Sequence, residues 1–148
     1  MGRELEEILQ EFEDTRTSFN TYRSKKEVGK GALLEYQSRF LNLRSELRYM
    51  KANLLGEWIK RDDKAATGIK FRIAIAIHEG KYSDEKGDLI YDACTINQAE
   101  KFASGSKAYK EFLSQRSFYK ESYTNVADLR NDCDGFINLI KDILKTIQ

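Results

Sequence analysis

A short segment in the middle of the chain combines positive charge with apolar and aromatic side chains. The segment Ile69–Ile73 contains Lys70, Phe71 and Arg72 in succession. Cationic side chains neutralise phosphates, and aromatic faces stack on bases, which together hold single-stranded nucleic acid without reading its sequence. The segment is therefore a candidate nucleic-acid-binding site. An amphipathic helix with two exposed cations and a buried phenylalanine has the same pattern, and spacing alone favours this simpler interpretation.

Further cations and aromatic residues lie near this segment and extend the candidate site. Residues 31–81 hold ten basic and six acidic side chains, whereas acidic residues outnumber basic ones on both sides. A local positive excess indicates an acidic partner, although this excess is small. The candidate phosphate contacts are Lys60, Arg61, Lys64, Lys70, Arg72 and Lys81, and the candidate stacking residues are Trp58, Phe71 and Tyr82.

The sequence contains no pattern typical of catalysis. The single histidine, His78, has no cysteine or acidic pair at a metal-ligand spacing, and no phosphate-binding glycine motif is present. Cys94 and Cys133 lie far apart in sequence, and we interpret them as two reduced thiols. We therefore predict a protein that is not an enzyme and that needs no metal or cofactor.

The last forty residues have the alternating three-and-four spacing of a coiled-coil helix. A narrow stripe on so long a helix predicts packing against another helix, and seam arginines would set register or stoichiometry. We therefore expect a homo-oligomer, whose number of subunits the sequence does not define. The seam consists of Tyr109, Phe112, Arg116, Tyr119, Tyr123, Val126, Arg130, Cys133, Ile137, Ile140, Leu144 and Ile147.

The elements that position these residues are predicted to be mainly α. We expect a single domain over residues 1–148, an elongated helical hairpin or bundle with coiled-coil-like seams. The expected elements are an N-terminal helix over 1–28, a long basic helix over 31–79, and C-terminal helices over 88–148. Residues 69–77 also alternate with period two, so a strand is the alternative there.

Smaller signals refine these boundaries. Thr15 fills a gap in the apolar stripe of the first helix, and a polar loop is expected between Gly80 and Gly87. A shorter helix is predicted over 89–103, and Ser106 is a candidate N-cap for the terminal helix.

Composition indicates a cytoplasmic protein. One third of the residues are charged and proline is absent, which suits long solvent-exposed helices. No run approaches 18 apolar residues, and the acidic N-terminal segment lacks the apolar region of a signal peptide. We therefore expect neither a membrane span nor secretion.

The segment Ile69-Lys70-Phe71-Arg72-Ile73 is similar to the Leu-Lys-Ala-Arg-Leu core of the UvsY-type recombination mediators of T4-like phages. The order of elements is also similar, loosely over residues 33–145, with a charged helix before the motif and a tyrosine-bearing terminal helix after it. The N-terminal and C-terminal helices are longer here, and isoleucines follow the arginine. The resemblance implies that Lys70 and Arg72 belong to a single-stranded DNA-binding surface, and that the C-terminal helices assemble the protein into rings.

The resemblance leads to the expected function. It implies a non-enzymatic phage protein in the bacterial cytoplasm that helps a RecA-like recombinase replace the single-strand-binding protein. The alternative is a helical protein-binding module, such as an inhibitor of a host defence system or an assembly adaptor, whose contact surface would be a mixed helix face. A structural coiled-coil scaffold without a ligand is a third possibility.

Overall fold

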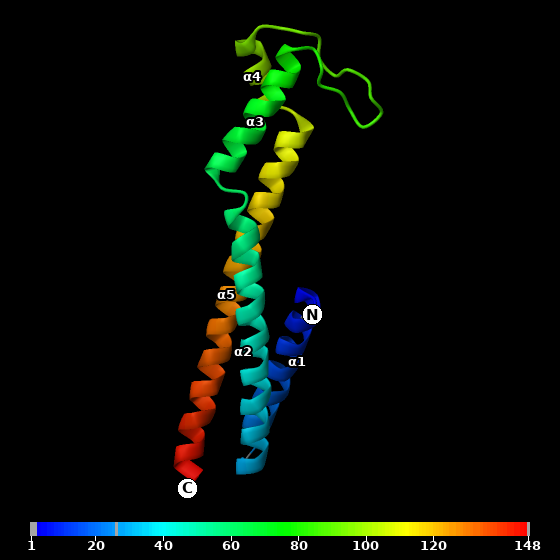
Figure 1. Ribbon diagram of the computed structural model, residues 1–148. Coiled ribbons are helices and arrows are strands. Elements are labelled where there is room, and N and C mark those ends of the chain that lie inside the picture. Colours follow the sequence, from blue (N-terminus) through cyan, green and yellow to red (C-terminus); the bar gives the residue numbers. More distant parts are fainter. Residues whose placement is uncertain (1–2, 26, 148) are drawn as a thin grey trace. The chain divides into compact units, whose positions relative to one another are not determined.

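The computed structural model describes residues 3–25 and 27–147, and all regular elements there are helices (Figure 1). The mainly α prediction is confirmed, and residues 69–77 are helical. Within the described residues, a single isolated β-bridge joins Ser83 to Leu89. The helices are α1 (Leu5–Arg23), α2 (Lys30–Ile59), α3 (Asp63–His78), α4 (Ile96–Ser104) and α5 (Lys107–Ile147).

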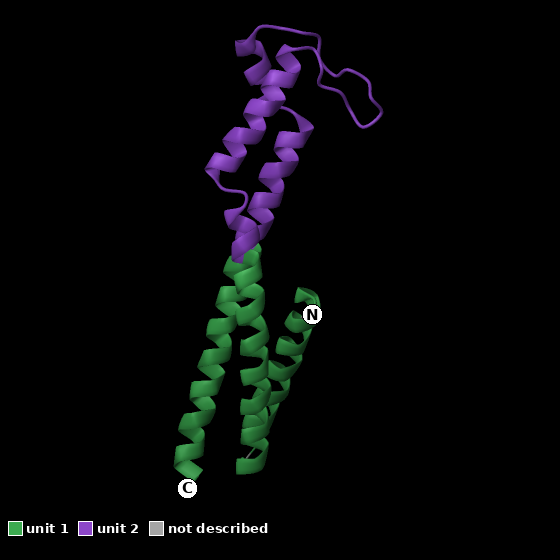
Figure 2. Ribbon diagram, viewed as in Figure 1, with its two compact units in different colours: residues 1–54, 122–148 green, residues 55–121 purple. Residues whose placement is uncertain are grey.

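The chain, expected to form one domain, packs as two compact units (Figure 2). Unit 1 comprises residues 1–54 and 122–148, and unit 2 comprises residues 55–121. Helices α2 and α5 each contribute one part to unit 1 and another to unit 2. Each unit has a hydrophobic cluster of its own.

Unit 1 is held together by aromatic packing between α1, α2 and α5. Phe40 of α2 stacks on Phe136 of α5 with ring centroids 4.7 Å apart. Phe19 of α1 meets both rings edge-on, at 5.9 Å from Phe40 and 5.8 Å from Phe136. Phe12 adds a fourth ring, 6.4 Å from Phe40. Edge-to-face and offset-stacked rings are the favourable arrangements, so this cluster fixes the three helices against one another.

The seam of α5 finds its partners within the chain. Its members Val126, Cys133, Ile137 and Ile140 are buried in the same cluster as residues of α1 and α2. The sequence pattern thus correctly indicated that α5 packs against helices, but these helices belong to the same chain. In unit 1, the apolar stripe of α5 is therefore covered by helices of the same chain. The homo-oligomer stays a prediction.

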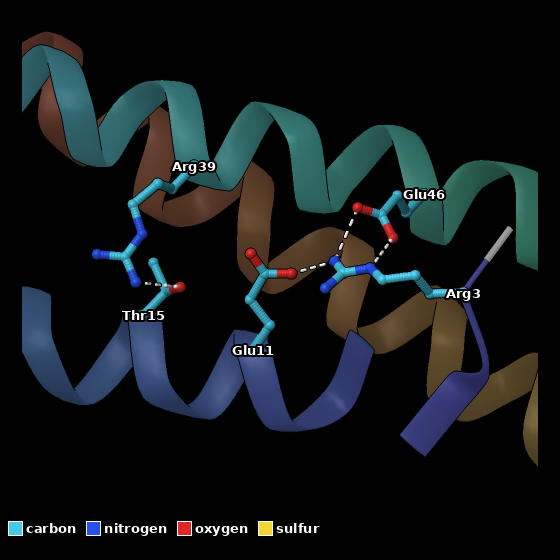
Figure 3. A network of polar contacts seen from close by, with 5 residues as sticks. All are labelled: Arg3, Glu11, Thr15, Arg39 and Glu46. Atoms are coloured by element: carbon cyan, nitrogen blue, oxygen red, sulfur yellow. Dashed lines mark hydrogen bonds and ion pairs between the residues drawn. The ribbon is translucent and has the colours of Figure 1, made fainter. Parts of the chain in front are cut away.

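Polar contacts join α1 to α2 on the surface of unit 1 (Figure 3). The Arg3 guanidinium donates to both carboxylate oxygens of Glu46 at 2.8 Å and also pairs with Glu11. These bonds, from Glu46 first and then Glu11, raise the pKa of Arg3. Arg39 donates to the hydroxyl of Thr15 at 3.1 Å. Thr15 is fully buried, so this bond satisfies a polar atom that the apolar core could not.

Unit 2 is built on α3 and α4. Ile73, Ala74 and Ile77 of α3 pack against Ala99 and Ala103 of α4. The small alanines of α4 allow the two helices to approach closely, and isoleucine side chains of α3 fill the remaining space. This packing holds the part of the chain that contains the candidate site.

Local caps explain where the helices of unit 2 begin. The long helix expected over residues 31–79 is interrupted at residues 60–62, because Asp62 caps α3 by accepting a bond from the Ala65 amide at 2.8 Å. The helix expected from residue 89 begins only at Ile96, after Thr95 as its N-cap. Ser106 is confirmed as the N-cap of α5, since its hydroxyl accepts from the Tyr109 amide at 3.3 Å.

Hydrogen bonds join the two ends of the loop between α3 and α4 and also form a turn within it. His78 Nδ1 lies 2.6 Å from the carbonyl oxygen of Cys94, which ties the end of α3 to the end of the loop. Within the loop, Asp84 accepts bonds from the amides of Lys86 and Asp88 at 2.9 and 3.0 Å. Gly87 completes this turn with a φ of 86°, a conformation that glycine adopts without strain.

Candidate nucleic-acid interface

Helix geometry separates the two cations of the predicted motif. Successive residues of an α-helix are rotated by about 100°, so Lys70 and Arg72 point about 160° apart around α3. Arg72 is exposed, whereas Lys70 is half-buried on the side of α3 that faces α4. The structure therefore does not bring these two residues together on one surface.

Arg72 lies about 80° around α3 from Lys64 and about 100° from Phe71, and all three side chains are exposed. Lys64 and Phe71 are seven residues apart, which places them two turns apart on the same side of the helix. The Phe71 side chain is 60% exposed, and Lys64 and Arg72 are also exposed. Neither cation forms an ion pair with any residue in the described part of the chain. We call Lys64, Phe71 and Arg72 the α3 face.

Two other predicted phosphate contacts are paired with a carboxylate upstream. Glu57 accepts from Lys60 at 3.2 Å and from Arg61 at 2.9 Å. These bonds, from Arg61 first and then Lys60, lower the pKa of Glu57. The Arg61 guanidinium also lies over the ring of Tyr119, 4.5 Å from its centroid. The spacing of three and four residues from Glu57 is a sequence signal for such pairs.

The remaining predicted residues are also engaged in contacts. Lys81 lies 3.3 Å from a carboxylate oxygen of Glu79. Trp58 is half-buried and has contacts of its own. The ring of Tyr82 packs on that of Tyr91, with centroids 6.1 Å apart. Of the predicted residues, Phe71 therefore has the most exposed aromatic ring, and Lys64, Lys70 and Arg72 form none of the ion pairs found in the described residues.

Seam residues of α5 in unit 2 serve internal contacts. Arg116 forms an ion pair of 2.7 Å with Asp63 at the start of α3. Tyr109 packs against the α3–α4 cluster, and Phe112 and Tyr119 are half-buried. One of the two seam arginines expected to set register or stoichiometry is thus paired with a carboxylate of α3 in its own chain. In unit 1, the seam residues Tyr123, Arg130 and Leu144 are half-buried, and Ile147 is exposed.

Lys70 lines a shallow groove between α3 and α4. The groove has a volume of about 390 Å³ and contains two ammonium groups, from Lys70 and Lys101, and one carboxylate, from Glu100. Asn97 and Ser104 add neutral hydrogen-bonding groups. Sequence reasoning did not single out Lys101, because its closeness to Lys70 depends on the packing of α4 on α3.

The described residues contain no cluster of side chains that could ligate a metal ion. No three histidine, cysteine, aspartate or glutamate side chains of residues 3–25 and 27–147 come close enough to hold a metal ion. Cys94 and Cys133 are both free thiols in the structure. Burial, followed by the charges of Asp134 and Asp132, raises the pKa of Cys133 to about 12, so this thiol stays protonated at neutral pH.

The helices and the comparisons with other proteins add two findings. None of the described helices has the length and apolar character needed to cross a bilayer. Comparison with family models, with curated proteins and with solved structures gives no significant match for this chain. The resemblance to the UvsY-type mediators therefore stays a prediction that depends on the motif residues and the order of elements.

Proposed function

We propose that this protein is a non-enzymatic single-stranded DNA-binding factor and that the α3 face contacts the strand. The exposure of Phe71 on a helix that also exposes Lys64 and Arg72 carries the proposal. A phenylalanine ring that is 60% exposed leaves apolar surface in water, and a stacked base would cover it. Lys64 and Arg72, which are both exposed on α3, would neutralise phosphates near that base.

Because unit 2 has almost no net charge, only the cations of the α3 face would attract the phosphates of the strand. Residues 55–121 contain twelve basic and eleven acidic side chains, so the unit as a whole has little net charge. We therefore expect modest affinity for each chain and a moderate dependence on salt. Self-association, if it occurs, would strengthen binding by raising the effective concentration of weak sites.

The finer role we propose is recombination mediation in a phage-infected cell. Its support is the resemblance of residues 69–73 and of the order of elements to the UvsY-type mediators. In this role the protein would assist a RecA-like recombinase on DNA covered by a single-strand-binding protein. The proposed α3 face keeps Arg72 from the residues that the resemblance implied and adds Lys64, because Lys70 lies on the side of α3 that faces α4.

Removing both cations of the α3 face tests the proposed surface. The double variant Lys64→Ala, Arg72→Ala is expected to bind labelled oligo-dT more weakly than the wild type. The slope of log affinity against log salt should fall by about 1.4, because each phosphate contact to a single strand contributes about 0.7. Fluorescence anisotropy titrations at four salt concentrations measure both quantities.

A double variant with the same change of charge provides the control. Lys60→Ala, Lys81→Ala also removes two positive charges from unit 2, but both of these lysines are paired with glutamates. The control is expected to keep most of the wild-type affinity and slope. Equal losses in the two double variants would show that net charge matters and the α3 face does not.

A protein-binding module remains the alternative function, and the loop before α4 favours it. Leu89 and Ile90 are 60% and 47% exposed in this loop, which is unusual for adjacent large apolar residues. A protein partner covering them would bind with weak dependence on salt, whereas phosphate contacts lose affinity steeply as salt rises. The same salt titration therefore separates the two functions.

A further inference from the structure

Three aromatic rings of unit 2 form a stack that ends at an exposed face. Tyr82 and Tyr91 of the loop have ring planes 27° apart and centroids separated by 6.1 Å. Tyr91 and Phe102 of α4 are closer, with an angle of 20° and a separation of 4.7 Å. Tyr82 and Tyr91 are half-buried, whereas Phe102 is 42% exposed. The stack of near-parallel rings therefore reaches solvent at Phe102.

Polar groups surround the exposed end of this stack. Gln98 lies four residues before Phe102 and is therefore its neighbour on the surface of α4. Lys101 directly precedes Phe102 and also lines the groove that contains Lys70. An exposed aromatic ring with a lysine next to it in sequence, and with a glutamine one turn before it, suits a flat polar ring better than an apolar protein surface.

We propose that Phe102 is a second base-stacking position, with Lys101 and Lys70 contacting the adjoining phosphate. This inference rests on the proposed function, because it assigns a further contact to the same single-stranded DNA. A base on Phe102 adds a fourth ring to the stack, and the half-buried tyrosines behind it hold the platform in place. The carboxylate of Glu100 reduces the net charge of the groove to one positive charge, which suits one phosphate and not two.

Substitutions at Phe102 test the stacking. Phe102→Ala is expected to lower the affinity for oligo-dT about fivefold to tenfold, within the range for the loss of one base–aromatic contact. Phe102→Leu keeps the apolar bulk without the aromatic face and should lose about as much, whereas Phe102→Tyr should bind like the wild type. Thermal unfolding of each variant, followed by circular dichroism, verifies that the fold is retained.

Photo-crosslinking locates the contact independently of affinity. Oligo-dT containing one 5-iododeoxyuridine is irradiated on the full-length protein, and tryptic peptides are identified by mass spectrometry. Cleavage after Lys101 and Lys107 releases residues 102–107, in which Phe102 is the single aromatic residue. An adduct on this peptide, in the wild type or in Phe102→Tyr, is the expected result.

The possible outcomes separate this inference from the proposed function. Absence of oligo-dT binding by the wild type would defeat both. Wild-type binding with unchanged affinity in Phe102→Ala, or with adducts only outside residues 102–107, would overturn the stacking position and leave the α3 face as the binding site. Full affinity in Phe102→Leu would show that bulk, and not stacking, is what matters at this position.

Discussion

Replacing Ile140 with aspartate is expected to unfold the protein. Ile140 is fully buried in the core of unit 1, where a carboxylate would have no cation or water to stabilise it. Burying an unpaired charge costs several kcal/mol, and a folded domain has only about 5–15 kcal/mol of stability in total. The variant should show no cooperative thermal transition when followed by circular dichroism.

Ile147→Asp provides the matched control on the same helix and the same seam. This side chain is 42% exposed, so its replacement should change the midpoint of thermal unfolding little. A folded Ile140→Asp protein with a wild-type transition would contradict the internal packing of α5. Folded monomers derived from a larger wild-type assembly would instead indicate that the seam joins different chains.

Replacing Phe40 with alanine is expected to destabilise unit 1 strongly. The Phe40 ring is fully buried and touches three other rings, those of Phe12, Phe19 and Phe136. Truncating a buried phenylalanine to alanine typically costs about 3–5 kcal/mol, through lost burial and the cavity that remains. Urea unfolding followed by circular dichroism measures the change in free energy.

Tyr49→Ala on the same helix serves as the comparison. The Tyr49 side chain is 60% exposed, and we expect a change within about 0.5 kcal/mol, as for most surface substitutions. A loss below about 1 kcal/mol in Phe40→Ala would mean that the aromatic cluster does not organise unit 1. The same result would question the assignment of Phe40 to the core.

The terminal helix shows both what the sequence pattern predicts and what it leaves open. Heptad spacing correctly predicted a long helix with a buried stripe, and Ser106 correctly marked its start. The spacing defines a stripe that needs a partner, but the identity of the partner depends on contacts between residues distant in sequence. Arg44 and Asp134 are ninety residues apart in sequence and form an ion pair of 2.9 Å. Such a contact cannot be read from local spacing, because it exists only in the folded chain.

The candidate site was predictable only in part. The sequence pointed to Phe71 and Arg72, and both are exposed on α3. Lys70 and Arg72 were both predicted to contact phosphates, and on α3 they lie on different sides because residues two apart on a helix do not face each other. Phe102 and Lys101 were missed, since their positions depend on the packing of α4 against α3 and of the loop against α4. No spacing rule relates these segments.

The most direct test of the proposed function is fluorescence anisotropy of labelled oligo-dT titrated with the wild-type protein, first at low and then at moderate salt. We predict saturable binding at low salt that weakens as salt rises, because phosphate contacts from exposed cations release counterions. No binding at low salt would contradict single-stranded DNA binding, and the exposed loop residues Leu89 and Ile90 would then be the surface to test with a protein partner.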